Sequence, residues 1–395
     1  MKFPALLFRT HPNTFHHGTL GAIRSLGRAG VEVHAHVENR RVPIARSRYL
    51  HQAHPWPRSA EPQQLMDDLA RSAAAIGRSA VLIPMDDAAA IFIAENPEVG
   101  NHFLISPGES SLTRQLADKS TLADHCEKSG TPYPETYVPT SPAEIDAAVG
   151  HLGLPLIAKW ARPWLIAAGS GQRSTMLIRT REQAHALWSE GSPASPLILQ
   201  RKIAPEAGSD WFFQGYFSSS SRCLFGGVGR KIAAHPQEAG HTVLGEWKDN
   251  PEIEHVAHRL VESIGHKGLV DLDFRYDKAS GKYFLLDFNP RAGAQFRLFT
   301  DRSGIDPVRA MHIDIANGTF PASPGPRFGR TYLVENHYVR RSPRKYRPSA
   351  LARAVRRGEL AWFDTADLKP FISMIAHSTN AIIERLRKFF PGRSG

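Results

Sequence analysis

The sequence lacks the features that disulfide-bonded, secreted or membrane-spanning proteins require. Only two of its 395 residues are cysteines, Cys126 and Cys223, so no disulfide framework can form, and both are expected to be packing residues in a reducing compartment. No apolar run approaches the roughly 20 residues that cross a bilayer. The apolar start at residues 3–8 reaches Arg9 and His11 too soon for a secretory signal and is expected to be a buried strand. These absences indicate a cytoplasmic globular protein.

The chain is also short of acidic residues, but only near its C-terminus. The net charge is +11, from 49 Lys and Arg against 38 Asp and Glu. Residues 327–395 hold 15 of the basic and 5 of the acidic residues, which leaves 34 against 33 in residues 1–326. A nearly neutral body argues against the basic groove that binds a nucleic-acid backbone, so no nucleic-acid partner is expected.

The basic C-terminal extension, residues 326–395, is predicted to have two parts. A cluster flanked by prolines is expected to be extended and solvated: Arg340, Arg341, Arg344, Lys345 and Arg347. Apolar residues then recur at helical spacing beside Arg385 and Lys388, namely Phe371, Ile375, Ile382, Leu386 and Phe389. Such a basic amphipathic helix can lie on an anionic membrane surface, which would make the protein membrane-peripheral. It can instead pack on the protein's own body or on a second subunit of a homo-oligomer, and these alternatives stay open.

Two domains are expected before the extension. Residues 1–110 alternate apolar runs at 3–8, 31–35 and 81–84 with helical patterns, which predicts an N-terminal doubly wound α/β domain with a parallel sheet. Residues 111–325 read as an α+β domain with a small lid at about 131–205. Its expected strands are 154–158, 176–179, 197–200, 211–217, 223–228, 269–275 and 283–288, with a helix at 252–264.

The most informative segment is the hairpin formed by the last two of these strands. Asp271 and Asp273 fall on one face of the first strand, and Asp287 and Asn289 fall on one face of the second. Acids placed together in this way need a cation, and Mg²⁺ bridging nucleotide phosphates would satisfy them. The alternative is an ordinary solvated strand face.

The stretch Leu286–Arg291 resembles the metal-binding signature of ATP-grasp enzymes, which runs acid, apolar, Asn, small residue or Pro, Arg. The resemblance implies Asp273, Asp287 and Asn289 as metal ligands, for one or two Mg²⁺ ions or for Mn²⁺. It also implies that Arg291 steadies the transferred phosphoryl group or an acyl phosphate. The family usually has Glu at both acidic positions, and the shorter Asp at both positions puts the number of ions in doubt.

The same resemblance implies an ATP site upstream. Two lysines resemble the nucleotide lysines of the family. Lys119 stands before a helix that closes at Gly130, and Lys159 stands at the end of a short strand. Further nucleotide contacts are implied for the mobile loop residues Gly169, Ser170 and Gly171, the hinge residues Gln200, Arg201 and Ile203, and the ribose contact Asp210. Taken singly, the lysines read as surface charges and the glycines as an ordinary turn; the order along the chain favours the ATP site.

Other basic residues are candidates for the substrate or the phosphates. Arg230 and Lys231 close a strand where the family often places a basic phosphate or substrate contact, although a solvated strand end is an equal explanation. Arg297 and Arg302 follow the metal strand and are candidates for binding a substrate carboxylate. Three histidines lie near the first strand-to-helix turn: His11, His16 and His17. Their spacing matches no common zinc pattern. Because open α/β sheets bind ligands beyond the strand ends, these histidines are expected to contact substrate rather than metal.

The function implied is ATP-dependent ligation. Over residues 1–320 the chain resembles ATP-grasp carboxylate–amine ligases of the kind related to D-aspartate ligase, which release ADP and phosphate through an acyl phosphate. The expected substrates are a small carboxylate and an amine, both of the amino-acid class. Two alternatives remain, a small-molecule kinase on the same scaffold and a nucleotide-binding regulatory module without enzymatic activity.

Overall fold

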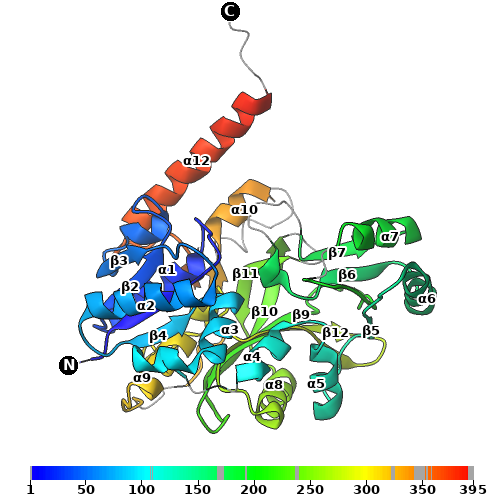
Figure 1. Cartoon of the computed structure of the whole chain (residues 1–395), viewed down its shortest axis with the longest axis horizontal. Coiled ribbons are helices and arrows are strands. Elements are labelled where there is room, and N and C mark those ends of the chain that lie inside the picture. The colour runs from blue at the N-terminus through cyan, green and yellow to red at the C-terminus, as the bar shows by residue number, and fades with distance from the viewer. Residues whose placement is uncertain are drawn as a thin grey trace, which may run out of the picture.

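The structure is a computed structural model, and it contains three β-sheets (Figure 1). It describes residues 2–106, 108, 110–166, 173–191, 194–235, 240–321, 325–341, 352, 355–356 and 358–389. Among these, no helix is long and apolar enough to cross a membrane.

The first sheet is parallel, with strand order β3-β2-β1-β4, as residues 1–110 predicted. Its strands are β1 (Ala5–Phe8), β2 (Val33–Val37), β3 (Gln52–Pro55) and β4 (Val81–Pro84), and its helices are α1 (His17–Arg28), α2 (Pro62–Ile76) and α3 (Asp87–Glu95), with short 3-10 turns η1 (Pro43–Arg46) and η2 (Pro97–Asn101). Ala5 and Leu7 of β1 pack with α1, whereas Leu6 and Phe8 pack with α2 and α3. Alternate residues of one strand therefore serve two helical layers, which confirms the doubly wound arrangement.

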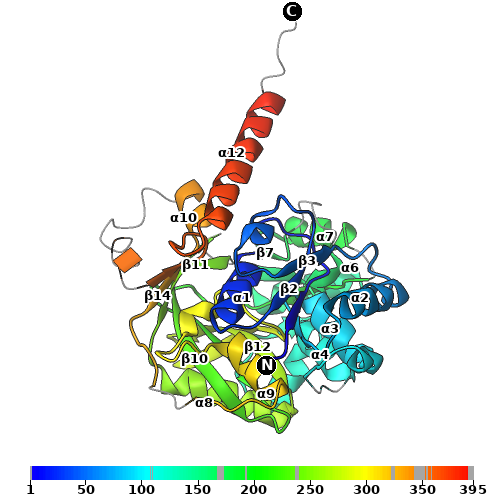
Figure 2. The ribbon, with the colours of Figure 1, turned by 90° about the vertical axis from the view of Figure 1, so that its left-hand side faces the viewer.

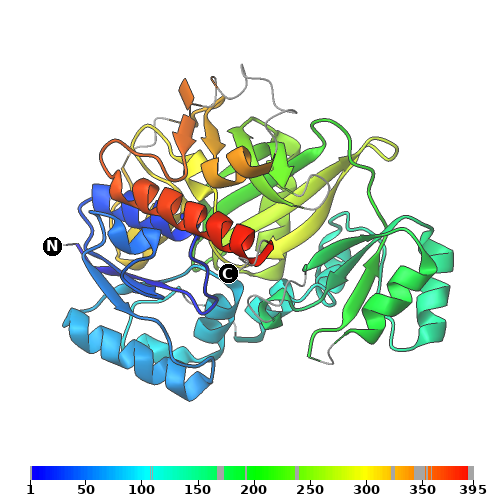
Figure 3. The ribbon, with the colours of Figure 1, turned by 90° about the horizontal axis from the view of Figure 1, so that it is seen from above.

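The second sheet forms a small lobe at the right of Figures 1 and 3. It has antiparallel order β5-β8-β6-β7. The elements of the lobe are β5 (Thr136–Tyr137), α6 (Pro142–Leu152), β6 (Leu156–Trp160), η3 (Pro163–Leu165), β7 (Thr175–Ile178), α7 (Arg181–Ser189) and β8 (Leu197–Gln200). Ala158 and Leu199, on neighbouring strands, are fully buried with Ile145 of α6 and Ala184 of α7. The lobe thus has a hydrophobic core of its own.

The third sheet has seven strands in the order β13-β12-β9-β10-β11-β14-β15 and lies between the other two. Its elements are β9 (Asp210–Phe217), β10 (Cys223–His235), β11 (His241–Trp247), α8 (Pro251–Ile264), β12 (Gly268–Asp277), β13 (Lys282–Asn289), η4 (Phe296–Phe299), α9 (Pro307–Ile315), β14 (Thr331–Leu333) and β15 (Gly358–Leu360). Helices α4 (Ser110–Ala117) and α5 (Leu122–Ser129) precede the small lobe. Helix α5 ends at Gly130, as expected, and Lys119 lies in the break between α4 and α5.

The C-terminal segment differs from the extension expected from residue 326. β14 and β15 complete the central sheet, so residues 331–333 and 358–360 are part of the body. Arg340 and Arg341 are the last two residues of helix α10 (Glu335–Arg341), so the backbone there is helical and not extended as expected. The rest of the basic cluster lies outside the described residues.

Helix α12 (Lys369–Phe389) leaves the body as a rod (Figures 1 and 2). The beginning of its apolar stripe contacts the body: Met374 is buried, and Phe371 packs on the same core and on Phe363. Ile375 is 46% exposed. The side chains of Ile382, Arg385, Leu386, Lys388 and Phe389 lie outside the part of the chain that is described. The first turns of the stripe therefore pack on the protein's own body, and the membrane contact stays a prediction.

Candidate active site

The centre of the site is the β12–β13 hairpin. Asp273 is the cross-strand partner of Asp287, and Asp271 is the partner of Asn289. Directly opposite residues on antiparallel strands have side chains about 5 Å apart on the same face, so the four polar groups form a compact patch. Asn289 Nδ2 donates to the Asp271 carbonyl at 3.1 Å, which leaves the amide oxygen of Asn289 available as an acceptor.

Three lysines converge on this hairpin: Lys119 and Lys159 are buried, and the side chain of Lys231 is 12% exposed. Lys119 is ion-paired with Asp287, Lys231 Nζ is 2.7 Å from Asp273 Oδ1, and Lys159 Nζ donates to the Leu286 carbonyl at 2.7 Å. They come from the α4–α5 break, from β10 and from β6. The structure therefore brings together three lysines that are far apart in the sequence.

Burial and charge have opposite effects on the pKa values of these groups. Burial lowers the pKa of Lys159 to about 8, against the attraction of Asp287. For Lys231 burial also lowers the pKa, but the adjacent Asp273 outweighs it and the net pKa is raised. Burial raises the pKa of Asp287, but Lys119 and Lys159 outweigh it and the net pKa is lowered. Asp287 is therefore ionised at neutral pH.

A pocket opens over this constellation between the small lobe and the central sheet. Beside Lys159, Lys231, Asp273 and Asp287, its lining includes the predicted hinge and ribose residues Gln200, Arg201, Ile203 and Asp210. Arg275 holds Asp210 and Ile203 together at this end of the pocket, because it donates to Asp210 at 2.6 Å and to the Ile203 carbonyl at 3.2 Å. Gln200 is buried, and its Nε2 donates to Thr136 at 2.9 Å.

Some candidates are not brought into this pocket. Arg230 is adjacent to Lys231 in β10, so strand alternation sends it to the opposite face, where it pairs with Glu246 at 2.8 Å. Arg297 is buried in an ion pair with Glu359, and Arg302 is exposed, so the structure gives neither arginine a place in a substrate pocket. Gly169, Ser170 and Gly171 lie outside the described residues.

A second pocket of about 530 Å³ adjoins the first, and His241 lines both. Arg291 lies in its wall, with Nη1 2.6 Å from Asp271 Oδ2 and Nε 3.4 Å from Asp87 Oδ1. A side chain at Gly293 would overlap Gln214, which donates to Asp271 at 2.8 Å, so this glycine permits the close packing behind Arg291.

The N-terminal domain supplies the other wall of the second pocket, including His11, His16 and His17. Burial lowers the pKa of His17 to about 3, so its imidazole is neutral. Asp87 Oδ1 is buried without a hydrogen bond, and burial raises the pKa of this carboxyl, against the attraction of Arg291.

Asp87 was missed in the sequence analysis. Its neighbour Asp86 is structural, because it caps α3 and accepts hydrogen bonds from the backbone N–H groups of Thr10 and His11, each at 2.8 Å. An acid pair directly after the apolar strand β4 was the available signal, since open α/β sheets bind ligands beyond the carboxyl ends of their strands.

Comparison with known proteins shows which fold this is. No family model matches the chain. The biotin carboxylase domain of Hydrogenobacter thermophilus 2-oxoglutarate carboxylase, solved with MgADP, ADP and bicarbonate, superposes with a TM-score of 0.60 at 15% identity, over 84% of this chain and 74% of that chain. L-amino acid ligase from Bacillus licheniformis superposes with a TM-score of 0.59 at 13% identity, over 80% of this chain and 74% of that chain. The chain has the ATP-grasp fold.

The sequence is also similar to that of a known ligase. The chain is 23% identical to D-aspartate ligase of Enterococcus faecium (strain Aus0004) over 248 residues, which cover 59% of this chain and 58% of that protein. The chain thus spans a little over half the length of this relative.

Proposed function

We propose that the protein is an ATP-dependent carboxylate–amine ligase that forms an amide or peptide bond and releases ADP and phosphate through an acyl phosphate. The observation that carries the proposal is the pairing of Asp273 with Asp287 among three lysines, two of them buried, in a pocket that shares His241 with an adjoining second pocket. A ligase needs both a phosphate-binding site and an adjoining chamber for the acceptor.

The hairpin fits Mg²⁺. Asp273, Asp287 and the Asn289 amide offer only oxygen ligands, which Mg²⁺ prefers, and the two carboxylates are 33% and 28% exposed and so within reach of an ion. One or two ions would be held there, and Mn²⁺ would be accepted by the same ligands. When bound, the metal neutralises charge on the phosphate oxygens.

Lys119 and Lys231 would then exchange their carboxylate partners for phosphate oxygens, and Lys159 would exchange the Leu286 carbonyl. Lys119 and Lys159 would bind the α- and β-phosphates as point charges, and Lys231 would bind near the transferred phosphoryl group. At the other end of the pocket the Arg201 carbonyl and Ile203 N–H would read the adenine edge, and Asp210 would accept from ribose hydroxyls. The small lobe, within residues 131–205, would act as the lid of a domain spanning 111–325.

The second pocket would hold the carboxylate and the amine. Its volume lies in the range of small-molecule sites, and Arg291 at its junction with the hairpin would bind oxygens of the acyl phosphate. Asp87, a partly buried carboxylate that lines this pocket beside Arg291, would accept from the substrate ammonium. Neutral His16 and His17 would provide uncharged hydrogen-bonding groups, so the preferred substrates are small amino acids.

The experiment is a screen of paired amino acids and small carboxylates for ADP and phosphate release, with mass detection of the product. Amine-dependent release of both ADP and phosphate supports the ligase. ADP without phosphate would show a kinase, and neither product would leave a nucleotide-binding module. Asp287→Asn should abolish release, whereas Asp277→Asn, in the turn of the same hairpin, should retain it.

A further inference from the structure

A row of buried histidines lies on one face of the parallel sheet, outside both pockets. His34 and His36 are two residues apart in β2 and share a face, and His54 of β3 is the cross-strand partner of His36. Helix α2 covers this face, with Ser72 Oγ 3.1 Å from His36 Nε2. Burial lowers the pKa of His36 to about 3 and that of His54 to about 4, so both rings are neutral at physiological pH.

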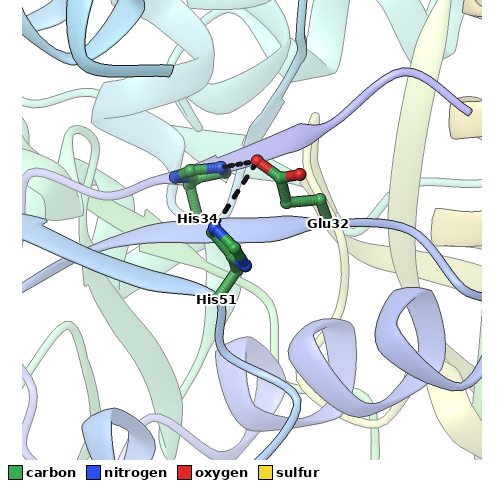
Figure 4. Close-up of side chains that lie close together, drawn as sticks. All are labelled: Glu32, His34 and His51. Atoms are coloured by element: carbon green, nitrogen blue, oxygen red, sulfur yellow. Dashed lines mark hydrogen bonds and ion pairs between the residues drawn. The ribbon is translucent and has the colours of Figure 1, made fainter.

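At the amino ends of β2 and β3 the row reaches the surface, where His34 meets Glu32 and His51 (Figure 4). His34 Nε2 is 3.0 Å and His51 Nε2 is 3.7 Å from the same oxygen, Glu32 Oε1, and the three ligand atoms lie within 4.8 Å of one another. Ligands around a tetrahedral Zn²⁺ at about 2 Å stand about 3.3 Å apart. Two of the three separations, 3.0 and 3.7 Å, already lie close to this value, and the third, which is at most 4.8 Å, would shorten when an ion binds.

We propose that Glu32, His34 and His51 bind a divalent transition-metal ion of the Zn²⁺ class, with water as the remaining ligand. Two imidazole nitrogens and one carboxylate oxygen suit Zn²⁺ and discriminate against Mg²⁺, which prefers oxygen ligands alone. This site is distinct from the hairpin in both position and donor chemistry.

Two neighbours hold the ligands in place. His34 Nδ1 is 3.0 Å from His54 Nε2, so when His34 Nε2 binds the metal its proton resides on Nδ1 and is donated to the neutral His54. His54 then carries its own proton on Nδ1, and neither ring gains or loses a proton. Arg78 Nη2 donates to Glu32 Oε2 at 2.7 Å, which leaves Oε1 directed at the two imidazoles.

The ion would tie together the two ends of the segment between β2 and β3. His51 follows that segment and is 59% exposed, whereas Glu32 and His34 stand before and within β2. The segment contains η1, against which helix α12 begins. The role is therefore structural: the metal would fasten the N-terminal sheet and the base of α12.

The test counts Zn²⁺ bound per chain by equilibrium dialysis, with Mg²⁺ in excess to occupy oxygen-donor sites. His51→Ala and Glu32→Gln should each bind one Zn²⁺ fewer than the wild type, and the added thermal stability that Zn²⁺ gives the wild type should be lost. His151→Ala is the matched control, because His151 is 60% exposed and 2.7 Å from Glu135, but among the described residues no third metal-ligating group joins this pair. It should bind as many ions as the wild type.

The exposed position of His51 means that His51→Ala should fold normally, which circular dichroism would verify. Co²⁺ provides a second readout, since tetrahedral coordination by nitrogen and oxygen gives visible absorption that His51→Ala should lose. Equal Zn²⁺ counts and equal Co²⁺ spectra for the wild type and His51→Ala would overturn the proposal. Neither measurement depends on ATP turnover.

Discussion

Replacing Lys159 with Met is expected to stabilise the nucleotide-free protein while removing nucleotide binding. Lys159 is 6% exposed, and burial lowers its pKa from 10.5 to about 8. Keeping this ammonium charged at neutral pH therefore costs about 3 kcal/mol. Loss of its hydrogen bond to the Leu286 carbonyl offsets about 1 kcal/mol of the gain. The expected net increase in the free energy of unfolding is about 2 kcal/mol.

The pH dependence identifies the cause of this stabilisation. Because the folded-state pKa of Lys159 is below its unfolded-state value, the cost is complete below pH 8 and disappears between pH 8 and pH 10.5. Urea unfolding followed by the fluorescence of the adjacent buried Trp160 would measure it at pH 7 and pH 10. Lys278→Met, in the exposed turn of the hairpin, should change stability by less than about 0.5 kcal/mol. A Lys159→Met protein less stable than the wild type at pH 7 would refute the reasoning.

Three further variants separate chemistry from structure. Asp287→Asn should lower the rate of ADP formation at least about a hundredfold without unfolding the protein, and near-normal turnover would remove Asp287 from the site. Lys231→Met should abolish turnover whereas Arg230→Met should keep most of it, and the reverse order in a coupled ADP assay would reverse the assignment. Asp367→Ala should lower the free energy of unfolding by about 3 kcal/mol because it removes the nearer carboxylate of buried Arg24 and leaves only Asp364, at 3.9 Å; urea unfolding unchanged from the wild type would contradict this.

The parts of the fold that could be predicted are those in which local pattern and tertiary structure agree. β8 has the predicted bounds of 197–200, and β12 and β13 extend their predicted ranges by one or two residues. The hairpin was predictable because residues two apart in a strand lie on the same face. Acids at alternate positions between apolar residues therefore form one polar face. Register then set Asp273 opposite Asp287, as the alternation of both strands requires.

The parts that could not be predicted depend on long-range packing. β14 and β15 have three residues each, and nothing local distinguishes them from loop: β14 pairs with the edge of β11, and β15 pairs in turn with β14. Arg230 and Lys231 are chemically alike and adjacent, so only the orientation of β10 decides which one faces the hairpin. The second pocket combines single residues from distant segments, such as Asp87 and Arg291, and carries no motif.

The C-terminal segment links the two walls of the second pocket. Arg24 of α1 is buried and donates to the carbonyls of Ala361 and Trp362 at 3.1 and 2.8 Å and to Asp367 at 3.0 Å. From the same segment, Glu359 pairs with Arg297, which lies in the turn η4 that follows β13. Helix α1 begins at the pocket, so this segment fixes the N-terminal wall relative to the hairpin. Because a buried ion pair that loses one partner costs several kcal/mol, Glu359 and Asp367 are expected to maintain the pocket geometry together with the first turns of α12, where Phe371 and Met374 pack on the same core.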